Sequence, residues 1–264
     1  MNLKKIKIII KKEWAEVFKN RMVIFTVAFL PLIMTALPLI ILYSTRDTGA
    51  VGSSDATQAI ASGLCTTDPN DPNCLQVTLV TQFLMMFMLI PLTIPTTIAA
   101  YSIVGEKNNK SLEPLLATPI STNELLLGKG LSALIPALIA TFGSFILFLV
   151  GAWIILIEKS ILFAFMDYRW MASIFIIGPL LAFFAVNLSL MVSSRVNDPR
   201  AAEQISVVVI IPVLAIFFGQ ISGLIVLNND VVTITAIVML LLDFVIYYFA
   251  NKVFQREIIL TRWK

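Results

Sequence analysis

Long apolar runs recur along the chain and alternate with short polar connections. A helix needs roughly 20 apolar residues to cross a hydrocarbon core of roughly 30 Å. Six runs reach that length, at residues 22–43, 77–104, 131–157, 171–192, 205–227 and 231–250. The pattern predicts an all-α fold, with residues 1–264 forming one polytopic transmembrane domain of six membrane-spanning helices. We expect no signal peptide, because the first run is too long and lacks a convincing small-residue cleavage site.

Residues 3–20, ahead of the first run, have the pattern of an amphipathic helix. At 100° per residue, one stripe collects the apolar side chains of Leu3, Ile6, Ile10, Trp14 and Val17. Lys4, Lys5, Lys11, Lys12, Glu16 and Lys19 lie elsewhere on the helix. A basic amphipathic helix that leads into a span is expected to lie in the headgroup plane. Residues 1–21 are therefore predicted to form an interfacial helix that anchors the first span.

The composition and the distribution of charge fix the expected topology. Hydrophobic residues make up 58% of the chain and charged residues 13%, whereas soluble domains have about 45–50% and about 25%. Sixteen of the nineteen lysines and arginines fall within residues 1–21, 105–130, 193–204 and 251–264. The positive-inside rule then places these segments, including both termini, in the cytoplasm. We expect a multi-pass plasma-membrane protein with a cytoplasmic tail at 251–264.

The largest connection on the opposite side, residues 44–76, is rich in polar and turn-forming residues. It contains both cysteines, Cys65 and Cys74. Two cysteines in such a loop suit a local disulfide if the compartment is oxidising, and two free thiols are the alternative. Two thiols with hard aspartate oxygens do not make a standard zinc site, so we expect no metal there.

The cytoplasmic connection at 105–130 contains two helix starts. Ser111 can cap a short helix, which Pro119 is expected to end. Ser121 and Glu124 then form a capping box that opens the next helix, which runs into the third span. This arrangement predicts a short cytoplasmic helix between two membrane helices, with Leu112, Leu115 and Leu116 available to a partner.

The segment EKNNKSLEPLLATPISTNELLLGK at 106–129 resembles the cytoplasmic signature of type 2 ABC-transporter permeases, the six-span membrane subunits of exporters. The resemblance extends to the interfacial helix, the six spans and the cytoplasmic termini. It implies a coupling helix within 106–124 that inserts into a separate ATP-binding subunit. The coupling residues would be Glu106, Leu112, Glu113, Leu115, Leu116 and Glu124. Arg195, Asp198 and Arg200, in the next cytoplasmic connection, resemble the family's second contact loop.

The same resemblance implies the composition of the assembly. Two membrane subunits, here a homodimer in the bilayer, would join two ATPase subunits that hold ATP and magnesium. We expect this chain to bind no cofactor and no nucleic acid and not to be an enzyme. It contains no histidine, which excludes histidine-dependent hydrolases. The Gly128–Lys129 pair is not a P-loop, because Asn123 stands where the first glycine is required.

Several polar residues lie within the predicted spans, where they are costly unless they are paired or hydrated. They are Asp243, Asn187, Gln220, Thr93 and Thr97. One interpretation places them along a cargo path. The alternative is packing between helices, for Asp243 through a hydrogen bond to Tyr247 one turn on. Pro91 and Pro95 should also kink or unwind the second span, with the threonine hydroxyls bonding the released carbonyls.

Two functions from different classes therefore remain open. The first is a permease subunit of an ATP-driven exporter whose cargo is hydrophobic or amphiphilic, or an ion. The second is a channel or a proton- or ion-coupled secondary carrier that uses Asp243. The second would leave the pattern at 106–129 unexplained.

Overall fold

The computed structural model describes residues 3–44, 83, 86–108, 121–156, 160–222 and 228–253. These residues are almost entirely helical and include no strand, which confirms the all-α prediction for the described part of the chain. The first four helices are α1 (Leu3–Val17), α2 (Arg21–Ser44), α5 (Ile90–Asn108) and α7 (Thr122–Ile155). They are followed by α8 (Ser160–Phe165), α9 (Tyr168–Ala172), the π-helical segment η2 (Ser173–Ile177) and α10 (Gly178–Ser193). The last are α11 (Pro199–Ser206), the 3₁₀ turn η3 (Val207–Val209), α12 (Ile210–Ile221) and α13 (Asn229–Val253).

Five helical stretches within the described residues are long and apolar enough to cross a membrane. They are Val23–Ser44, Asn123–Ile155, Tyr168–Ser193, Pro199–Gln220 and Asn229–Lys252. Of the predicted second span, 77–104, the structure describes residue 83 and the residues from 86 onward, and α5 begins at Ile90. The chain is therefore a multi-pass membrane protein, and the count of six spans stays a prediction.

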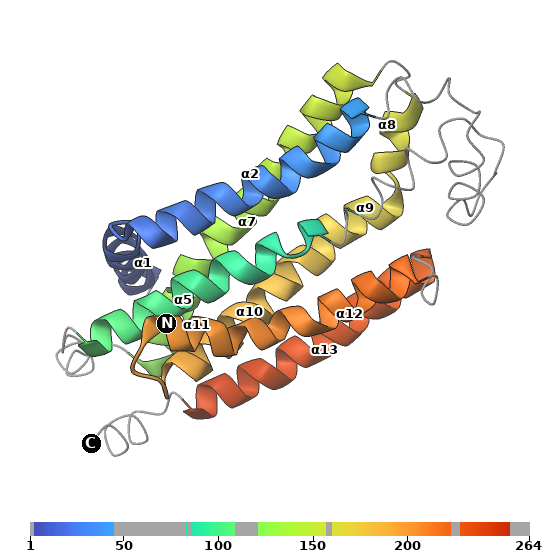
Figure 1. Ribbon diagram of the computed structural model, residues 1–264. Helices are drawn as coiled ribbons and strands as arrows, with labels where there is room; N and C mark the ends of the chain where they lie inside the picture. Colours follow the sequence, from blue (N-terminus) through green and yellow to red (C-terminus); the bar gives the residue numbers. More distant parts are fainter. Residues whose placement is uncertain are drawn as a thin grey trace.

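The long helices run alternately in opposite directions along one bundle (Figure 1). Helix α10 is central: it packs against α5, α7 and α13. Helix α2 packs on α7, and α11 packs on α10 and α5. Helix α1 is seen nearly end-on in Figure 1, so it lies across the direction of the long helices, and it contacts α7 and α5. We call this end of the bundle, where α13 also finishes, the α1 end.

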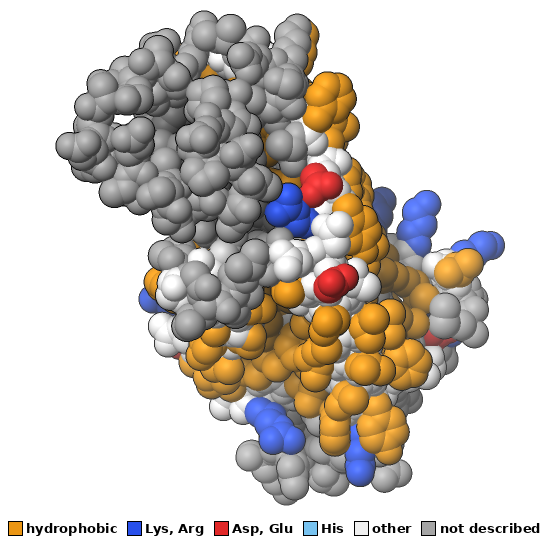
Figure 2. Space-filling model, turned by 90° about the vertical axis from the view of Figure 1, so that its right-hand side faces the viewer, with side chains coloured by type: hydrophobic (Ala, Val, Ile, Leu, Met, Phe, Trp, Pro, Cys, Tyr) orange, Lys and Arg blue, Asp and Glu red, His pale blue; other side chains and the backbone are white. Residues whose placement is uncertain are grey.

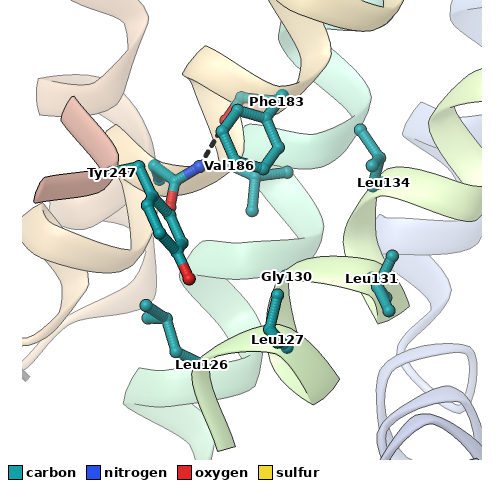
Figure 3. Close-up of a pocket in the computed structure, with 9 residues that line it drawn as sticks. Leu126, Leu127, Gly130, Leu131, Leu134, Phe183, Val186 and Tyr247 are labelled. Atoms are coloured by element: carbon teal, nitrogen blue, oxygen red, sulfur yellow. Dashed lines mark hydrogen bonds between the residues drawn. The ribbon is translucent and has the colours of Figure 1, made fainter. Parts of the chain in front are cut away.

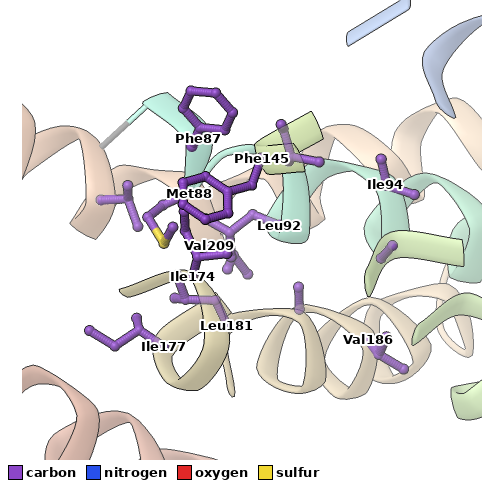
Figure 4. Packing of buried hydrophobic residues seen from close by; sticks show 14 of the residues in the cluster. Phe87, Met88, Leu92, Ile94, Phe145, Ile174, Ile177, Leu181, Val186 and Val209 are labelled. Atoms are coloured by element: carbon purple, nitrogen blue, oxygen red, sulfur yellow. The ribbon is translucent and has the colours of Figure 1, made fainter. Parts of the chain in front are cut away.

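An aromatic group within the apolar core surrounds Trp170, which is only 2% exposed. Its ring stacks on Phe148 at a centroid distance of 5.7 Å and meets Phe165 edge-on at 5.7 Å. Phe87 and Phe145 complete the aromatic group, and both appear in Figure 4. Aromatic pairs in these geometries stabilise a core beyond their buried area alone. The cluster fixes α9 against α7 and the segment that leads into α5.

Large hydrophobic side chains cover wide parts of the described surface (Figure 2). On α2 and α13 they include Phe25, Phe29, Leu241 and Phe244, all more than 45% exposed. A soluble protein rarely exposes apolar surface on this scale. These faces are instead suited to contact with lipid.

The amphipathic helix is present, and its buried face matches the predicted stripe at Ile6 and Val17 but not elsewhere. The buried side chains are Ile6, Ile9, Glu13 and Val17. Leu3, predicted on the apolar stripe, is 75% exposed. The predicted stripe ignored Glu13 because that residue is charged, whereas contact with α7 and α5 buries it. The contact of α1 with α7 and α5 therefore sets the orientation of the helix, and the distribution of apolar side chains along it does not.

The two prolines of the predicted second span both fall in α5, and the threonine hydroxyls do not bond the carbonyls that they release. Pro91 falls in the first turn, where a missing N–H is tolerated, and the helix continues through Pro95. The Thr93 hydroxyl donates to the Leu89 carbonyl at 2.8 Å, and the Thr97 hydroxyl donates to the Thr93 carbonyl at 3.1 Å. These are not the carbonyls that the prolines release, which belong to residues 87 and 91. The predicted second span is thus interrupted at Met88–Leu89, shortly before Pro91, whereas the helix continues without a break through Pro95.

Candidate functional site

Three helices bring four charged side chains together inside the α1 end of the bundle. Lys12 and Glu13 come from α1, Glu106 from α5 and Lys129 from α7. The side chains of Glu13, Glu106 and Lys129 are at most 1% exposed, and that of Lys12 is 33% exposed. We call these four residues the charged cluster. Two carboxylates face two ammonium groups, so the cluster is electrically balanced.

Lys129 is the centre of the cluster. Its Nζ lies 2.8 Å from Glu13 Oε1, 2.7 Å from Glu106 Oε2 and 2.9 Å from Ser102 Oγ. The ammonium group donates hydrogen bonds to Glu13 and Ser102 and forms an ion pair with Glu106. Ser102 in turn donates its hydroxyl proton to Glu13, and Lys12 completes the cluster by donating to Glu106. One lysine thus joins α1, α5 and α7 through buried, charge-assisted hydrogen bonds.

The close approach of α1 to α7 depends on a glycine beside this lysine. A Cβ atom added to Gly128 would lie 2.8 Å from Ile9 Cγ2 and 2.9 Å from Ile9 Cβ. No side chain larger than hydrogen fits there while α1 keeps its position. One turn after Gly128 in α7, the Ser132 carbonyl accepts a hydrogen bond from the Trp14 indole N–H of α1 at 2.9 Å. Gly128 and Trp14 therefore hold α1 at the distance that the charged cluster needs.

The electrostatic environment favours the charged forms of Glu106 and Lys12. Burial alone would raise the pKa of the Glu106 carboxyl, but Lys129 and Lys12 outweigh burial and lower this pKa below its ordinary value of 4.5. Burial alone would lower the pKa of the Lys12 ammonium, but Glu106, together with Glu13 and Glu16, raises it above 10.5. Each group therefore strengthens the charge of the other.

These pKa shifts predict how docking of α1 depends on pH. Stabilisation by Glu106 is complete above pH 4.5 and is lost as the pH falls through its lowered folded pKa. Stabilisation by Lys12 is complete below pH 10.5 and is lost as the pH rises through its raised folded pKa. Amide hydrogen exchange of α1, corrected for intrinsic rates, should be constant from about pH 5 to about pH 10. A transition in protection near neutral pH would contradict this account.

The charged cluster flanks the connection in which the coupling residues were predicted. Glu106 lies three residues before residues 109–120, and Lys129 lies in the second turn after α7 begins. The predicted capping box is confirmed: Ser121 Oγ accepts from Glu124 N at 3.3 Å, and Glu124 Oε2 accepts from Ser121 N at 3.1 Å. Leu112, Glu113, Leu115 and Leu116 lie outside the described residues.

The second predicted contact loop forms the start of a helix. Asp198 caps α11 by accepting from the Arg200 backbone N–H at 3.0 Å, and the side chains of Arg195 and Arg200 are exposed. Helix α11 is also tied to α5, because the Thr97 hydroxyl donates to Glu203 at 2.5 Å. Both segments predicted to contact a partner therefore connect to α5.

The structure does not gather the predicted cargo-path residues into one channel. Asn187 donates to the Phe183 carbonyl at 2.8 Å within its own helix and lines a small cavity of about 30 Å³ beside Tyr247 (Figure 3). Asp243 is 6% exposed, and neither carboxylate oxygen has a hydrogen-bond partner among the described residues. The predicted bond from Asp243 to Tyr247 is therefore absent. Gln220, near the far end of α12, likewise has a buried amide oxygen with no partner among the described residues.

The remaining predictions concern the two cysteines and metal binding. Cys65 and Cys74 lie outside it, so their pairing stays a prediction. Within the described residues, no group of three or more His, Cys, Asp or Glu side chains is placed to hold a metal ion.

Four members of the site were missed from the sequence: Lys12, Glu13, Ser102 and Lys129. Lys12 and Lys129 were counted among the cytoplasmic cations, and neither was assigned to a site. A usable signal was present, because Glu13 falls at helical spacing between Ile9 and Val17, on the face of α1 that is otherwise apolar. A carboxylate in that position needs a cation from another helix.

Sequence comparisons relate the chain to a known family of transporters. A family described as "ABC-2 family transporter protein" matches residues 7–257. Over 157 residues the chain is 32% identical to the ABC transporter permease protein NatB of Bacillus subtilis (strain 168). The match covers 52% of this chain and only 38% of that relative.

Proposed function

The chain belongs to the ABC-2 family of transporter proteins, and from this premise we propose that it is the membrane subunit of an ATP-driven exporter. Separate ATP-binding subunits would hydrolyse ATP and bind the magnesium ion. Two copies of this chain, with both termini in the cytoplasm, would form the transport path. The cargo would be a hydrophobic or amphiphilic molecule or an ion, since the spans carry few fixed charges.

The charged cluster is the observation that carries the proposal. It joins the helices on both sides of residues 109–120 to each other and to α1. Displacement of that connection would therefore move the ends of α5 and α7 together with α1, rather than bend a loose loop. A partner that closes on ATP could in this way shift two membrane helices as one unit.

The proposal also gives each predicted contact a role. The connection at 109–120 would receive the force, with Glu106 and Glu124 holding its two ends in place. The exposed Arg195 and Arg200, beside the Asp198 cap, would make the second contact with the ATPase subunit. Through Thr97 and Glu203, that contact reaches α5 as well.

Co-expression with candidate ATP-binding subunits tests the partnership directly. The tagged chain should retain one such subunit through purification, and the complex should hydrolyse ATP faster than that subunit alone. If no ATP-binding subunit associates and none is stimulated, the proposed partnership is wrong.

Substitutions in the predicted coupling helix should impair ATP hydrolysis by the complex without affecting insertion of the chain into the membrane. Glu113→Lys or Leu116→Trp should abolish cargo-dependent ATP hydrolysis, because each alters a side chain predicted to enter the ATPase cleft. Membrane insertion should remain normal. Asp230→Lys, an exposed charge reversal at the opposite end of the bundle, is the matched control. Normal turnover in the Glu113 and Leu116 variants would count against this role.

The alternative, a secondary carrier, rests on the buried and unpartnered carboxyl group of Asp243. If the ATP-driven account is correct, Asp243→Asn should keep ATP-dependent transport and should raise thermal stability, because a buried carboxylate without a partner is costly. Transport assays on the assembled complex, paired with thermal unfolding, provide the test. Loss of transport with intact assembly would instead assign Asp243 to the path of cargo or protons.

A further inference from the structure

A deep apolar cavity lies between α10, α12 and α13. Its volume is about 150 Å³. Figure 4 shows Met88, Ile177, Leu181 and Val209, which line one side of it. Val213 of α12 and Val232 of α13 also line it. These residues are buried, at 8% exposure or less, so the space reaches into the core and is more than a surface depression.

The chemistry of the lining is that of hydrocarbon. Among its side chains only Ser173 and Thr235 are polar. The Thr235 hydroxyl already donates to the Val231 carbonyl of its own helix at 2.7 Å. A water molecule needs two to four polar partners to be stable in a cavity, and an apolar cavity of about 150 Å³ stays dry and takes up small hydrocarbon groups. The space therefore fits an alkyl chain and does not fit an ion or a polar cargo.

The cavity opens toward the bilayer. Pro212 on α12 and Leu242 on α13 stand at its rim and are exposed. Helix α13 packs chiefly against α10 rather than against α12, so α12 and α13 do not close over the space. The outer faces of both helices carry exposed apolar side chains, such as Phe218 and Val238. In a multi-pass membrane protein, a mouth bordered in this way faces lipid tails.

Local backbone geometry keeps the space from closing. Ser173 and Ile177 bound the π-helical segment η2, whose wide turn carries the Gly178 N–H to the Ser173 carbonyl. A small serine side chain and a displaced turn leave room that a regular helix with a larger residue would fill. Such π segments are frequent at functional sites.

We propose that this cavity is a binding site for the acyl chain of a membrane phospholipid, which enters between α12 and α13. The chain restores the dispersion contacts that the empty lining would lack. It also bridges α12 to α13, which have little direct contact, so a bound lipid fixes the position of the last helix. The proposal does not depend on which cargo the protein moves.

Photolabelling in a defined bilayer tests this site. The full chain is placed in phosphatidylcholine nanodiscs that contain a trace of phosphatidylcholine with a diazirine in the middle of one acyl chain. After irradiation, labelled residues are mapped by mass spectrometry. We expect label on the buried residues Leu181 and Val213 as well as on exposed ones such as Phe218. Label confined to exposed residues would overturn the proposal.

A cavity-filling variant provides the second arm. Val213→Phe should abolish most of the label on Leu181, whereas Ile211→Phe, on the lipid-exposed face of the same helix, should leave it unchanged. If Val213→Phe fails to fold, the milder Thr235→Leu from α13 takes its place. Equal labelling of Leu181 in the wild type and in a folded cavity-filling variant would show that the lipid is not in the cavity.

Discussion

Replacing Lys129 by methionine is expected to destabilise the protein more than any other substitution at the α1 end. Within the charged cluster, Lys129 is the one cation that contacts both Glu13 and Glu106, and the variant removes it. Breaking a buried ion pair by removing one partner typically costs about 3–5 kcal/mol, because the remaining charge is buried without compensation. Denaturant or thermal unfolding in detergent measures the loss, and coupled ATP hydrolysis should fall with it.

Two comparison variants make this expectation specific. Lys252→Met removes an exposed cation from the end of α13 and should change stability by no more than about 0.5 kcal/mol. The double variant Glu13→Gln with Lys129→Met should recover much of the lost stability, because Glu106 keeps its partner Lys12. If the double variant is as unstable as Lys129→Met alone, uncompensated carboxylates are not the cause.

Gly128→Ala is expected to displace α1 from α7, although alanine is ordinarily the better helix former. Alanine in place of a helical glycine gains roughly 0.5–1 kcal/mol. At Gly128 the new methyl group would meet Ile9 Cβ at 2.9 Å, an atom that no side-chain rotation can move. Overpacking of this kind costs about 1–3 kcal/mol, so the net effect is destabilising. Hydrogen exchange of the α1 amides should accelerate.

The same helix supplies two controls for Gly128→Ala. A Cβ at Gly143 would have no atom within 4 Å, so Gly143→Ala should be neutral or stabilising. A Cβ at Gly151 would approach Leu39 Cδ1 and Cδ2, at the flexible end of a side chain, so Gly151→Ala should have an intermediate effect. Unchanged α1 exchange in Gly128→Ala would mean that α1 does not depend on this close approach.

The apolar pattern predicted most of the helices because a membrane span is set by local composition. It placed α2 within one residue at each end, and the Ser121 capping box located the start of α7 well ahead of the apolar run. At 34 residues, α7 is about 51 Å long and extends past the hydrocarbon core. The pattern could not orient α1, whose buried face is decided by contact with α7 and α5.

The candidate site was predicted only at its edges. Glu106 and Glu124 were identified through a motif that is local in sequence, and both are buried at the α1 end. The partners of Glu106 lie on other helices, 94 residues away in the case of Lys12, and pairings over such distances leave no local pattern. For Asp243 the sequence predicted the position within a span, but its expected partner Tyr247 does not form a hydrogen bond with it.

Transport in inverted membrane vesicles tests the central claim most directly. Vesicles would contain this chain with its co-purifying ATP-binding subunit, in wild-type form or with hydrolysis abolished, and would be screened with amphiphilic dyes and radiolabelled sodium. The account predicts uptake of at least one probe that requires ATP and the hydrolysing subunit. Uptake by this chain alone, without the subunit and without ATP, would contradict it.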